Sequence, residues 1–385
     1  MTIRSTSSHL SINRKAATRP AQPPAMTLDG VRAGINYLPV DLTIIKGTTV
    51  TAFGNSSDAL SRLLDTIAGF YPLLGGRILI GSEDVSTLRA GKRGIALVST
   101  RDPLFDHLDV RENIGFSRRA AGIDRSEIRA ETGRIIALLG LDGLDGRKPE
   151  ALTSEQKLRV SLARALMTAP AVLLLDDPLS RLDAHSAQKI SNLLATLSRA
   201  LDLTIFHAVS RREDALRPGG PVAVFQNAVL LQCADAARLY EHPASPEVAI
   251  AFGEANALTG QVLEISDDVA RVHLACGGVA EAVATENLKE GDECLVCIRP
   301  DRVAPFFGTQ SLGMDDDLPP LQGTLAHSLH LGDHIRMRVR FADGTEIELR
   351  RPPLQARQIP KTGAPVQVAW PAAHATAFPL RTDLY

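Results

Sequence analysis

The sequence predicts an α/β domain built on a parallel sheet, followed by an all-β domain built as a small barrel. From residue 27 onward, strand-like and helix-like segments alternate, as they do in α/β proteins. Residues 172–175 are apolar without interruption and are followed by Asp176 and Asp177, which is typical of a strand buried on both faces of a parallel sheet. From residue 256 onward, short alternating strands separated by turn residues dominate, at the spacing of a β-barrel.

Hydrophobic periodicity predicts the order of elements in the α/β domain. Residues 57–70 form a helical pattern, with Leu60 and Leu64 among the apolar residues on one face and Gly69 at its end. A helical subdomain is expected at about 105–165. The other predicted elements are two strands within 40–54, an antiparallel strand and turn at 76–85, a buried strand at 93–100, a strand at 203–210, helices at 184–201 and 234–242, and a hairpin at 221–233.

The predicted domains are a disordered tail at 1–26, an α/β domain at 27–255 and a β-barrel domain at 256–385. The tail is rich in Ser, Thr, Arg and Pro and contains no acidic residue, a composition that buries too little apolar surface to fold. The barrel is expected in two halves, 257–306 and 321–380, joined by an acidic, proline-containing linker.

Composition excludes several classes of function. Lys plus Arg (42) nearly balance Asp plus Glu (44), so no overall field favours nucleic acid or an anionic membrane. Only 4% of the residues are aromatic, which argues against platforms for base stacking. No apolar run approaches the roughly 18 residues that a membrane span needs. We expect no nucleic-acid binding, and membrane contact only through partners.

Two cysteines have the spacing of a metal-binding pair, Cys294 and Cys297. Their segment is predicted to be a strand, on which residues three apart point to opposite faces and cannot bind one metal ion together. We expect these residues, together with Cys233 and Cys276, to be reduced, buried thiols of a cytosolic protein.

The residues before and at the buried strand favour a nucleotide site. The order strand, tight loop, helix across 40–70 is that of a phosphate-binding loop. Asp176 and Asp177 follow the strand at the carboxyl edge, where P-loop NTPases hold Mg²⁺ and order the attacking water. The alternative is a buried strand that Asp-Asp-Pro closes as a turn.

Several segments in chain order resemble the ATP-binding subunit of ABC transporters, of the importer type with a C-terminal TOBE domain, as in polyamine and maltose systems. Residues 172–183 resemble the Walker B motif and D-loop, and 152–166 resemble the signature motif with its helix. The other similar segments are 104–116, 239–256, 298–301, 330–349 and 366–375. The resemblance covers about residues 27–385 and implies a P-loop NTPase-like (RecA-like) nucleotide-binding domain followed by an OB-like TOBE barrel.

The resemblance places the Walker A motif, G-x-x-x-x-G-K-[ST], on residues 54–61, where it is degenerate. The phosphate-binding lysine is Leu60, and Asp58 puts a carboxylate at the helix N-terminus that would receive phosphate. Arg62 lies about 200° around the helix from Leu60, too far to replace the lysine readily. The implied nucleotide-binding residues are Gly54, Asn55, Ser56, Ser57, Asp58, Ala59, Leu60, Ser61 and Arg62, and the implied Mg²⁺ ligands are Ser61 and Asp176.

The other catalytic positions also depart from the family pattern. The Q-loop glutamine aligns with Thr100, the switch histidine with Ser210, and the catalytic glutamate with Asp177, which is one methylene shorter. The signature LSGGQ is LTSEQ, so that side chains replace the glycines whose N–H groups approach phosphate. The implied signature and D-loop residues are Thr153, Ser154, Glu155, Gln156 and Asp183; the adenine-stacking aromatic aligns with Val31, with Tyr37 nearby.

The expected function is an ATP-binding-type subunit of an ABC importer, for a polyamine- or sugar-class solute, that binds MgATP weakly or not at all and does not hydrolyse it. Losing one preorganised charge stabiliser costs roughly 10²–10³ in rate, and several are absent here. The resemblance implies transmembrane permease subunits and a second ATP-binding chain, identical or a competent sister, as partners, and a peripheral location on the cytoplasmic face of the cell membrane.

Two alternatives stay open. One is a non-catalytic regulator or scaffold that uses the same fold for protein contacts. The other is a ligand-binding barrel whose Arg336, Arg338 and Arg340 share one strand face, although such a stripe is more typical of a solvated face.

Overall fold

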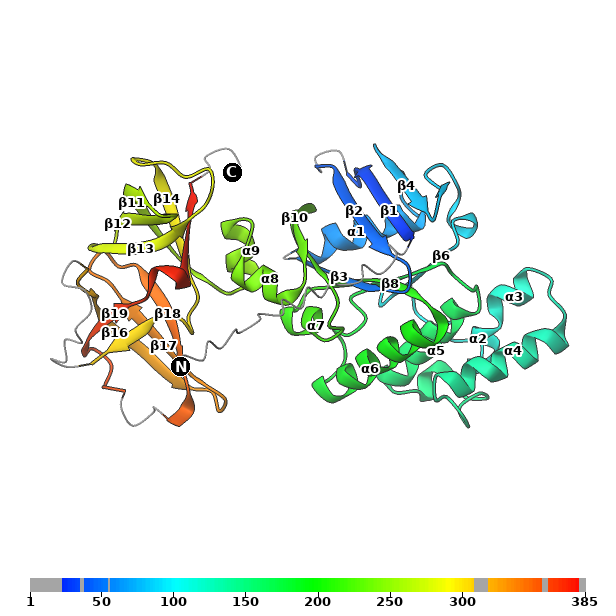
Figure 1. Cartoon of the computed structure of the whole chain (residues 1–385). Helices are drawn as coiled ribbons and strands as arrows, with labels where there is room; N and C mark the ends of the chain where they lie inside the picture. The colour runs from blue at the N-terminus through cyan, green and yellow to red at the C-terminus, as the bar shows by residue number, and fades with distance from the viewer. Residues whose placement is uncertain (1–22, 35–37, 55, 308–317, 355–358, 381–385) are drawn as a thin grey trace, which may run out of the picture.

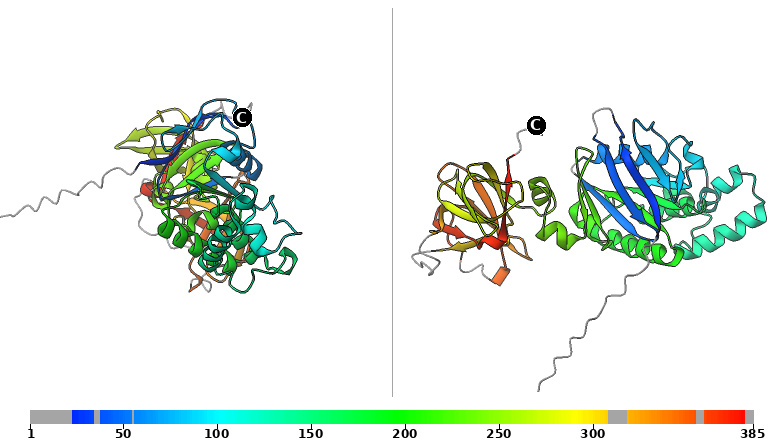
Figure 2. Two further views of the ribbon diagram at one scale, coloured as in Figure 1. Left: turned by 90° about the vertical axis from the view of Figure 1, so that its right-hand side faces the viewer. Right: turned by 45° about the horizontal axis from the view of Figure 1, so that its top comes forward.

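The computed structural model describes residues 23–34, 38–54, 56–307, 318–354 and 359–380. An α/β body and a β-barrel body lie at opposite ends, with α8 and α9 between them (Figures 1 and 2). The predictions for residues 1–22, Tyr37 and Asn55 fall outside the described residues. The tail prediction is wrong at residues 24–26, which belong to strand β1 (Pro24–Val31), because Ala25 and Met26 bury their apolar side chains there.

The main sheet of the α/β body has six strands in the order β10-β9-β3-β8-β7-β6. All neighbours pair in parallel except β10, which is antiparallel to β9. The prediction of a fully buried strand is confirmed for β7, whereas β6 lies at the sheet edge and buries only Val98 and Ser99. The strands are β3 (Thr49–Gly54), β6 (Ile95–Ser99), β7 (Val172–Asp176), β8 (Thr204–Val209), β9 (Val222–Gln226) and β10 (Val229–Ala234).

Helix α1 (Ser57–Ala68) packs its apolar face into a core shared by the main sheet and an antiparallel sheet ordered β2-β1-β4-β5. It ends at Gly69, whose φ of 90° is the left-handed conformation that glycine adopts without strain. The other strands of the second sheet are β2 (Val40–Ile45), β4 (Arg77–Ile80) and β5 (Glu83–Asp84). The two strands predicted within 40–54 and the helix after them are thereby confirmed.

The expected helical segments within 105–165 are confirmed. Helix α2 begins at an Asp109 cap, and the apolar residues of the subdomain pack in one core with β7 and α6. The bounds are α2 (Val110–Ile114), α3 (Phe116–Ala120), α4 (Arg125–Leu138), α5 (Ser154–Leu166) and α6 (Ala184–Leu201). The hairpin predicted at 221–233 is also confirmed, with Asn227 and Ala228 both at positive φ in its turn.

The β-barrel body contains a closed barrel ordered β11-β12-β13-β20-β14 and a five-stranded sheet ordered β15-β19-β16-β17-β18. The predicted halves are wrong as structural units, because each sheet takes a strand from the other half. Strand β20 (Ala375–Pro379) closes the first barrel between β13 and β14, and β15 (Ala304–Phe306) pairs with β19. Both sheets enclose one apolar core, which explains the exchange.

The remaining strands of this body follow in chain order. They are β11 (Asn256–Ser266), β12 (Val269–Leu274), β13 (Val279–Ala284), β14 (Glu293–Ile298), β16 (Leu321–His330), β17 (Ile335–Arg340), β18 (Glu346–Arg351) and β19 (Pro365–Ala369). On β17, Arg340 pairs with Glu346 at 2.7 Å and both Arg338 and Arg340 are exposed, as on a solvated strand face.

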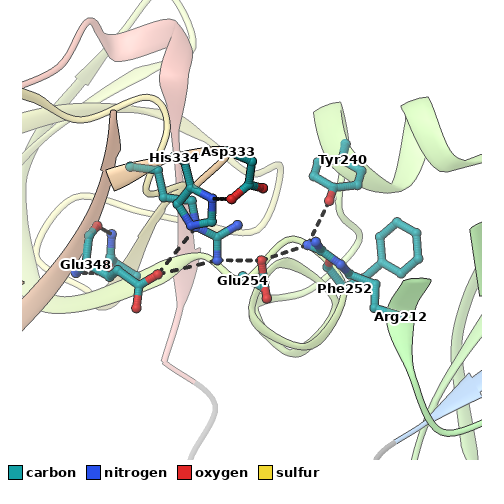
Figure 3. Close-up of polar contacts among 9 residues, drawn as sticks. Arg212, Tyr240, Phe252, Glu254, Asp333, His334 and Glu348 are labelled. Carbon is teal, nitrogen blue, oxygen red and sulfur yellow. Dashed lines mark hydrogen bonds and ion pairs between the residues drawn. The ribbon is translucent and has the colours of Figure 1, made fainter. Parts of the chain in front are cut away.

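Glu254 joins the two bodies. One of its carboxylate oxygens, Oε2, lies 2.9 Å from Nη1 of Arg212 and 2.8 Å from Nη2 of Arg350 on β18 (Figure 3). Arg212 begins helix α7 (Arg212–Leu216), two residues after Ser210. Helices α7 and α9 (Pro246–Ala251) were not predicted; the helix expected at 234–242 is α8 (Ala236–Glu241).

Candidate functional site

The segment expected to bind phosphate is the first turn of a capped helix. Helix α1 starts at Ser57, and the Ser56 hydroxyl accepts a hydrogen bond from the Ala59 N–H at 3.3 Å. The Leu60 N–H donates to the carbonyl of Ser56. In a phosphate-binding loop such N–H groups point at the anion. Here two of them are satisfied within the chain, and exposed Asp58 lies in the same turn.

Leu60 points into the core and not toward the loop. Its side chain is 3% exposed and packs with the apolar face of α1. Gly54 also has a structural reason to be glycine, because a Cβ there would lie 2.9 Å from the carbonyl oxygen of Phe225. Exposed Arg62 lies over the ring of Tyr71, 4.9 Å from its centroid, and so does not take the place of the missing lysine.

The buried carboxylate of Asp176 is fully engaged by side chains from three elements. Its Oδ1 accepts from the Ser61 hydroxyl at 2.7 Å, and its Oδ2 accepts from the Ser99 hydroxyl at 3.0 Å. Oδ2 also pairs with the Arg101 guanidinium, with Nη2 at 2.9 Å and Nε at 3.1 Å. The structure therefore brings together Ser61 and Asp176, as expected, and adds an arginine to them.

Arg101 also forms an ion pair with a second buried carboxylate, that of Asp65 on α1. Its Nη1 and Nη2 each donate to one oxygen of Asp65 at 3.0 Å, the two-pronged geometry that suits a guanidinium. Hydrogen bonding to Asp65 is the main cause that raises the pKa of Arg101 above its ordinary value. Nη2 is shared between Asp65 and Asp176, so both carboxylates lie against one positive charge.

Sequence analysis missed Arg101 and Asp65, although each left a signal. Arg101 comes two residues after the end of β6, and Ser99 on β6 is in register with Asp176 on the neighbouring strand. Asp65 interrupts the apolar face of α1 and is 6% exposed, so it needs a charged partner. Knowing that β6 and β7 are neighbours would have placed Arg101 near Asp176, whereas Asp65 depends on the packing of α1.

These residues do not fit a bound Mg²⁺ ion. Magnesium would need Ser61 and a free oxygen of Asp176, in an octahedral shell completed by phosphate and water. A cation there would lie beside the Arg101 guanidinium and compete with it for the same carboxylate oxygen. With Leu60 buried and the helix end capped, the positive charges that hold a triphosphate are also missing from this end of α1. No metal- or nucleotide-dependent step is derived for this chain.

Asp177 and Ser210 form a separate pair. Asp177 has a φ of 44°, and its Oδ2 accepts from the Ser210 hydroxyl at 2.8 Å. Its Oδ1 is buried and has no hydrogen-bond partner among the described residues. Burial is the main cause that raises the pKa of Asp177, which makes the carboxylate costly at neutral pH. The residues at the expected general-base and switch-histidine positions, Asp177 and Ser210, therefore contact each other, but as a carboxyl group and a hydroxyl group.

The signature residues are used to begin helix α5. Thr153 caps the helix by accepting from the Gln156 N–H, and the Gln156 side chain accepts from the Thr153 N–H in return. Glu155 pairs with Arg159 at 2.8 Å, so its charge is balanced within the helix. Ser154 is exposed, where a glycine would leave the backbone open.

The two remaining expected site residues are Asp183, which caps a helix, and Thr100, for which the contacts show no role. Asp183 caps helix α6 by accepting from the N–H groups of His185 and Ser186, and these hydrogen bonds lower its pKa. Thr100 is half-buried between Ser99 and Arg101 and makes no hydrogen bond through its side chain within the described part of the chain.

The cysteine prediction is confirmed for the pair on β14: Cys294 belongs to the barrel core and Cys297 to a cluster on the opposite face. The predicted burial is wrong for Cys233, which is exposed because its strand β10 lies at the edge of the main sheet. Burial raises the pKa of Cys297 to about 12 and that of Cys294 to about 11, so both are unreactive thiols. The residues that the structure describes include no cluster of three or more His, Cys, Asp or Glu suited to a metal ion. Among their helices, none has the length and apolarity to cross a membrane.

Comparisons with known proteins agree with this fold. Residues 37–180 match the family model for ABC transporters, and residues 296–378 match that for the TOBE domain. The Fe(3+) ions import ATP-binding protein FbpC of Brucella abortus (strain 2308) is 33% identical over 79% of this chain and 83% of its own length. The putative 2-aminoethylphosphonate import ATP-binding protein PhnT of Salmonella choleraesuis is 34% identical over 69% of this chain and 72% of its own length.

A solved structure shares the fold at lower identity. It is cbiO1 from Clostridium perfringens, part of the ABC transporter complex cbiONQ, with a TM-score of 0.53 and 21% identity, covering 60% of this chain and 95% of that one.

Proposed function

Because this chain belongs to the ATP-binding subunits of ABC importers with a C-terminal TOBE domain, we propose that it serves as an importer subunit that does not itself hydrolyse ATP. The observation that carries the proposal is Leu60, which stands at the lysine position and lies in the core, 3% exposed. The capped start of α1 supports it, since the Ala59 and Leu60 N–H groups are already hydrogen-bonded to Ser56.

The proposed partners are transmembrane permease subunits and a second ATP-binding chain that supplies turnover. A groove of about 370 Å³ beside the helical subdomain is our candidate for the permease contact. It lies along the edge strand β6 and is lined by Phe105 and half-exposed Phe116, with the Arg164 guanidinium 5.2 Å from the Phe105 ring centroid. Docked in this way, the chain would lie peripherally on the cytoplasmic face of the cell membrane.

The transported solute stays a prediction. Sequence analysis expects a polyamine- or sugar-class solute, whereas the relatives above are named for Fe³⁺ ions and for 2-aminoethylphosphonate. Uptake assays on cells that lack this chain should therefore include all four solutes, and the one whose uptake falls identifies the importer.

The first test compares wild type with Leu60→Lys, and with Leu60→Met as the matched control of similar shape. We expect wild-type turnover to be at least about 10²-fold below that of a competent subunit, because the phosphate-binding charge is absent. Leu60→Lys should not restore MgATP binding in calorimetry. It should instead destabilise the fold by about 3 kcal/mol, because it buries an unpaired ammonium.

Ordinary MgATP turnover by wild type that Asp177→Ala abolishes would contradict the proposal. Restored binding in Leu60→Lys would contradict the core role of residue 60, but would agree with the missing lysine as the cause of the low turnover.

The regulatory or scaffold function is the second candidate, and the ion-paired state of Asp176 favours it. Nucleotide affinity separates the two candidates. An importer subunit should form a stable complex with a permease and a sister ATP-binding chain, whereas a scaffold should bind its protein partner with MgATP present or absent.

A further inference from the structure

We propose that the Arg101 guanidinium occupies the place of the metal ion. The Mg²⁺ site of this fold is then a permanent ion-paired cluster of Arg101, Asp65 and Asp176, which we call the clasp. The inference rests on the proposed function, because it concerns the same site. It predicts in addition that the described site takes no divalent cation at all, a property that loss of the lysine alone does not imply.

The contacts of the clasp place a fixed positive charge at the metal position. Asp176 Oδ2 has Arg101 Nη2 at 2.9 Å and Arg101 Nε at 3.1 Å, and its other oxygen holds Ser61. A hydroxyl can exchange its hydrogen bond for a metal ligand. A guanidinium cannot share the place with a dication, because like charges a few ångströms apart repel, and the two carboxylates that hold Arg101 are less than a tenth exposed.

The second carboxylate shows that the site is adapted to the arginine. Asp65 is 6% exposed on α1, and both its oxygens accept from Arg101. Without Arg101, two buried carboxylates would lie close together and repel each other. One Nη2 contacts both of them, so the two acids and the arginine form a single unit.

The clasp also fixes the chain that leads into the helical subdomain. Arg101 follows β6 and precedes α2, whereas its partners lie on α1 and at the end of β7. The connection between core and subdomain is therefore held by side chains of this protein, without a ligand. A subunit built in this way keeps one arrangement of this connection whether nucleotide is present or not.

The experiment uses the full chain and Mn²⁺ as the probe, with binding followed by electron paramagnetic resonance and calorimetry. We expect wild type to bind no Mn²⁺ at this site and to show the same Tm in excess Mg²⁺ and in EDTA. Arg101→Met should lower the Tm and create one Mn²⁺ site, bound at least about tenfold more tightly than by wild type, because the freed carboxylates become hard-cation ligands.

Two controls locate the site. Arg101→Lys keeps the charge and should behave like wild type toward Mn²⁺. Arg101→Met combined with Asp176→Asn should lose the new site. Wild type that binds Mn²⁺ as tightly as Arg101→Met does would overturn the inference, even if that variant folds poorly. Mn²⁺ binding that persists in the double variant with Asp176→Asn would overturn it too.

The outcome is separable from that of the proposed function. Mn²⁺ binding by wild type without ATP turnover would overturn the clasp alone, whereas turnover of MgATP by wild type would overturn both.

Discussion

At the scale of single residues, Asp177 has a carboxylate that its surroundings make costly to charge. Its carboxylate is partly buried at the end of β7, holds one hydrogen bond from Ser210, and has one oxygen unpaired within the described chain. Burial raises its pKa, so that the native state binds the proton more tightly than the unfolded chain does. Above that raised pKa, the charged group lowers the free energy of unfolding.

Asp177→Asn should therefore stabilise the protein, and the gain should depend on pH. Because burial raises the pKa, the cost of the charge is absent below the unfolded value of 3.8 and grows as pH rises through the higher native value. We expect Tm to rise by a few degrees at pH 7.5, equivalent to about 1 kcal/mol, and the gain to shrink toward pH 4. Asparagine tolerates the positive φ, so the backbone is preserved.

Thermal unfolding by calorimetry at both pH values measures this effect. Asp183→Asn is the matched control: hydrogen bonds lower the pKa of Asp183, so the pH trend of that variant should have the opposite sign. A gain for Asp177→Asn that is equal at both pH values would show that the carboxylate is not the source of the cost.

At the scale of elements, β20 is the segment that makes the C-terminal region one folding unit. It comes from the end of the chain and pairs with β14 in antiparallel and with β13 in parallel orientation. Its Ala375 and Ala377 are buried in the common core. The barrel therefore cannot close until the last strand has been placed.

Ala377→Asp should unfold the barrel body selectively. A carboxylate placed at a fully buried alanine lacks a partner and should cost about 3 kcal/mol, which is about 1.5 M in the urea midpoint at a typical slope. Trp370, the only tryptophan, is buried in this body and donates to the Glu281 carbonyl, so its fluorescence reports on the barrel.

Circular dichroism at the helix wavelength reports mainly on the α/β body, which contains all the longer helices of the described chain. We expect the fluorescence midpoint to fall while the helix signal moves little. Thr376→Asp, one residue away and only half-buried, is the control and should have a much smaller effect. Equal shifts of both signals would mean that the bodies unfold together.

At the scale of the whole molecule, Glu254 connects the end of the α/β body to the barrel. It lies between α9 and β11, and its Oε2 bridges Arg212 and Arg350 (Figure 3). Arg212 also donates to the Tyr240 hydroxyl at 2.9 Å, which ties α7 to α8. Two ion pairs, Arg212–Glu254 and Glu254–Arg350, therefore connect the segment after Ser210 to the barrel body.

Glu254→Gln should loosen the two bodies without unfolding either one. The carboxylate is 40% exposed, so solvent screens it, and we expect a loss of about 1 kcal/mol or less. Small-angle scattering should show a larger radius of gyration and a broader distance distribution. A double-mutant cycle with Arg212→Gln should be non-additive, whereas one with Glu241→Gln, an exposed residue on α8, should be additive. Strict additivity with Arg212 would contradict a shared bridge.

The sequence by itself determined the family and most of the elements of the α/β body, although not helices α7 and α9. The apolar run of β7, the helical face around Leu60 and the turn at Asn227 are local patterns, so propensity and periodicity were sufficient to predict them. The resemblance to the family motifs implied which catalytic residue types are absent, because that comparison needs only residue identities.

Only the tertiary structure shows which side chains lie where the absent catalytic groups would act. The clasp of Arg101 with Asp65 and Asp176 joins residues 36 and 75 positions apart, and it exists only because β6 and β7 are neighbours over α1. The place of β20 and the bridge at Glu254 likewise depend on which distant segments pack together. Local periodicity shows which face of an element is buried, but not which other element covers that face. Which charged side chains form ion pairs depends on the covering element, so only the tertiary structure shows them.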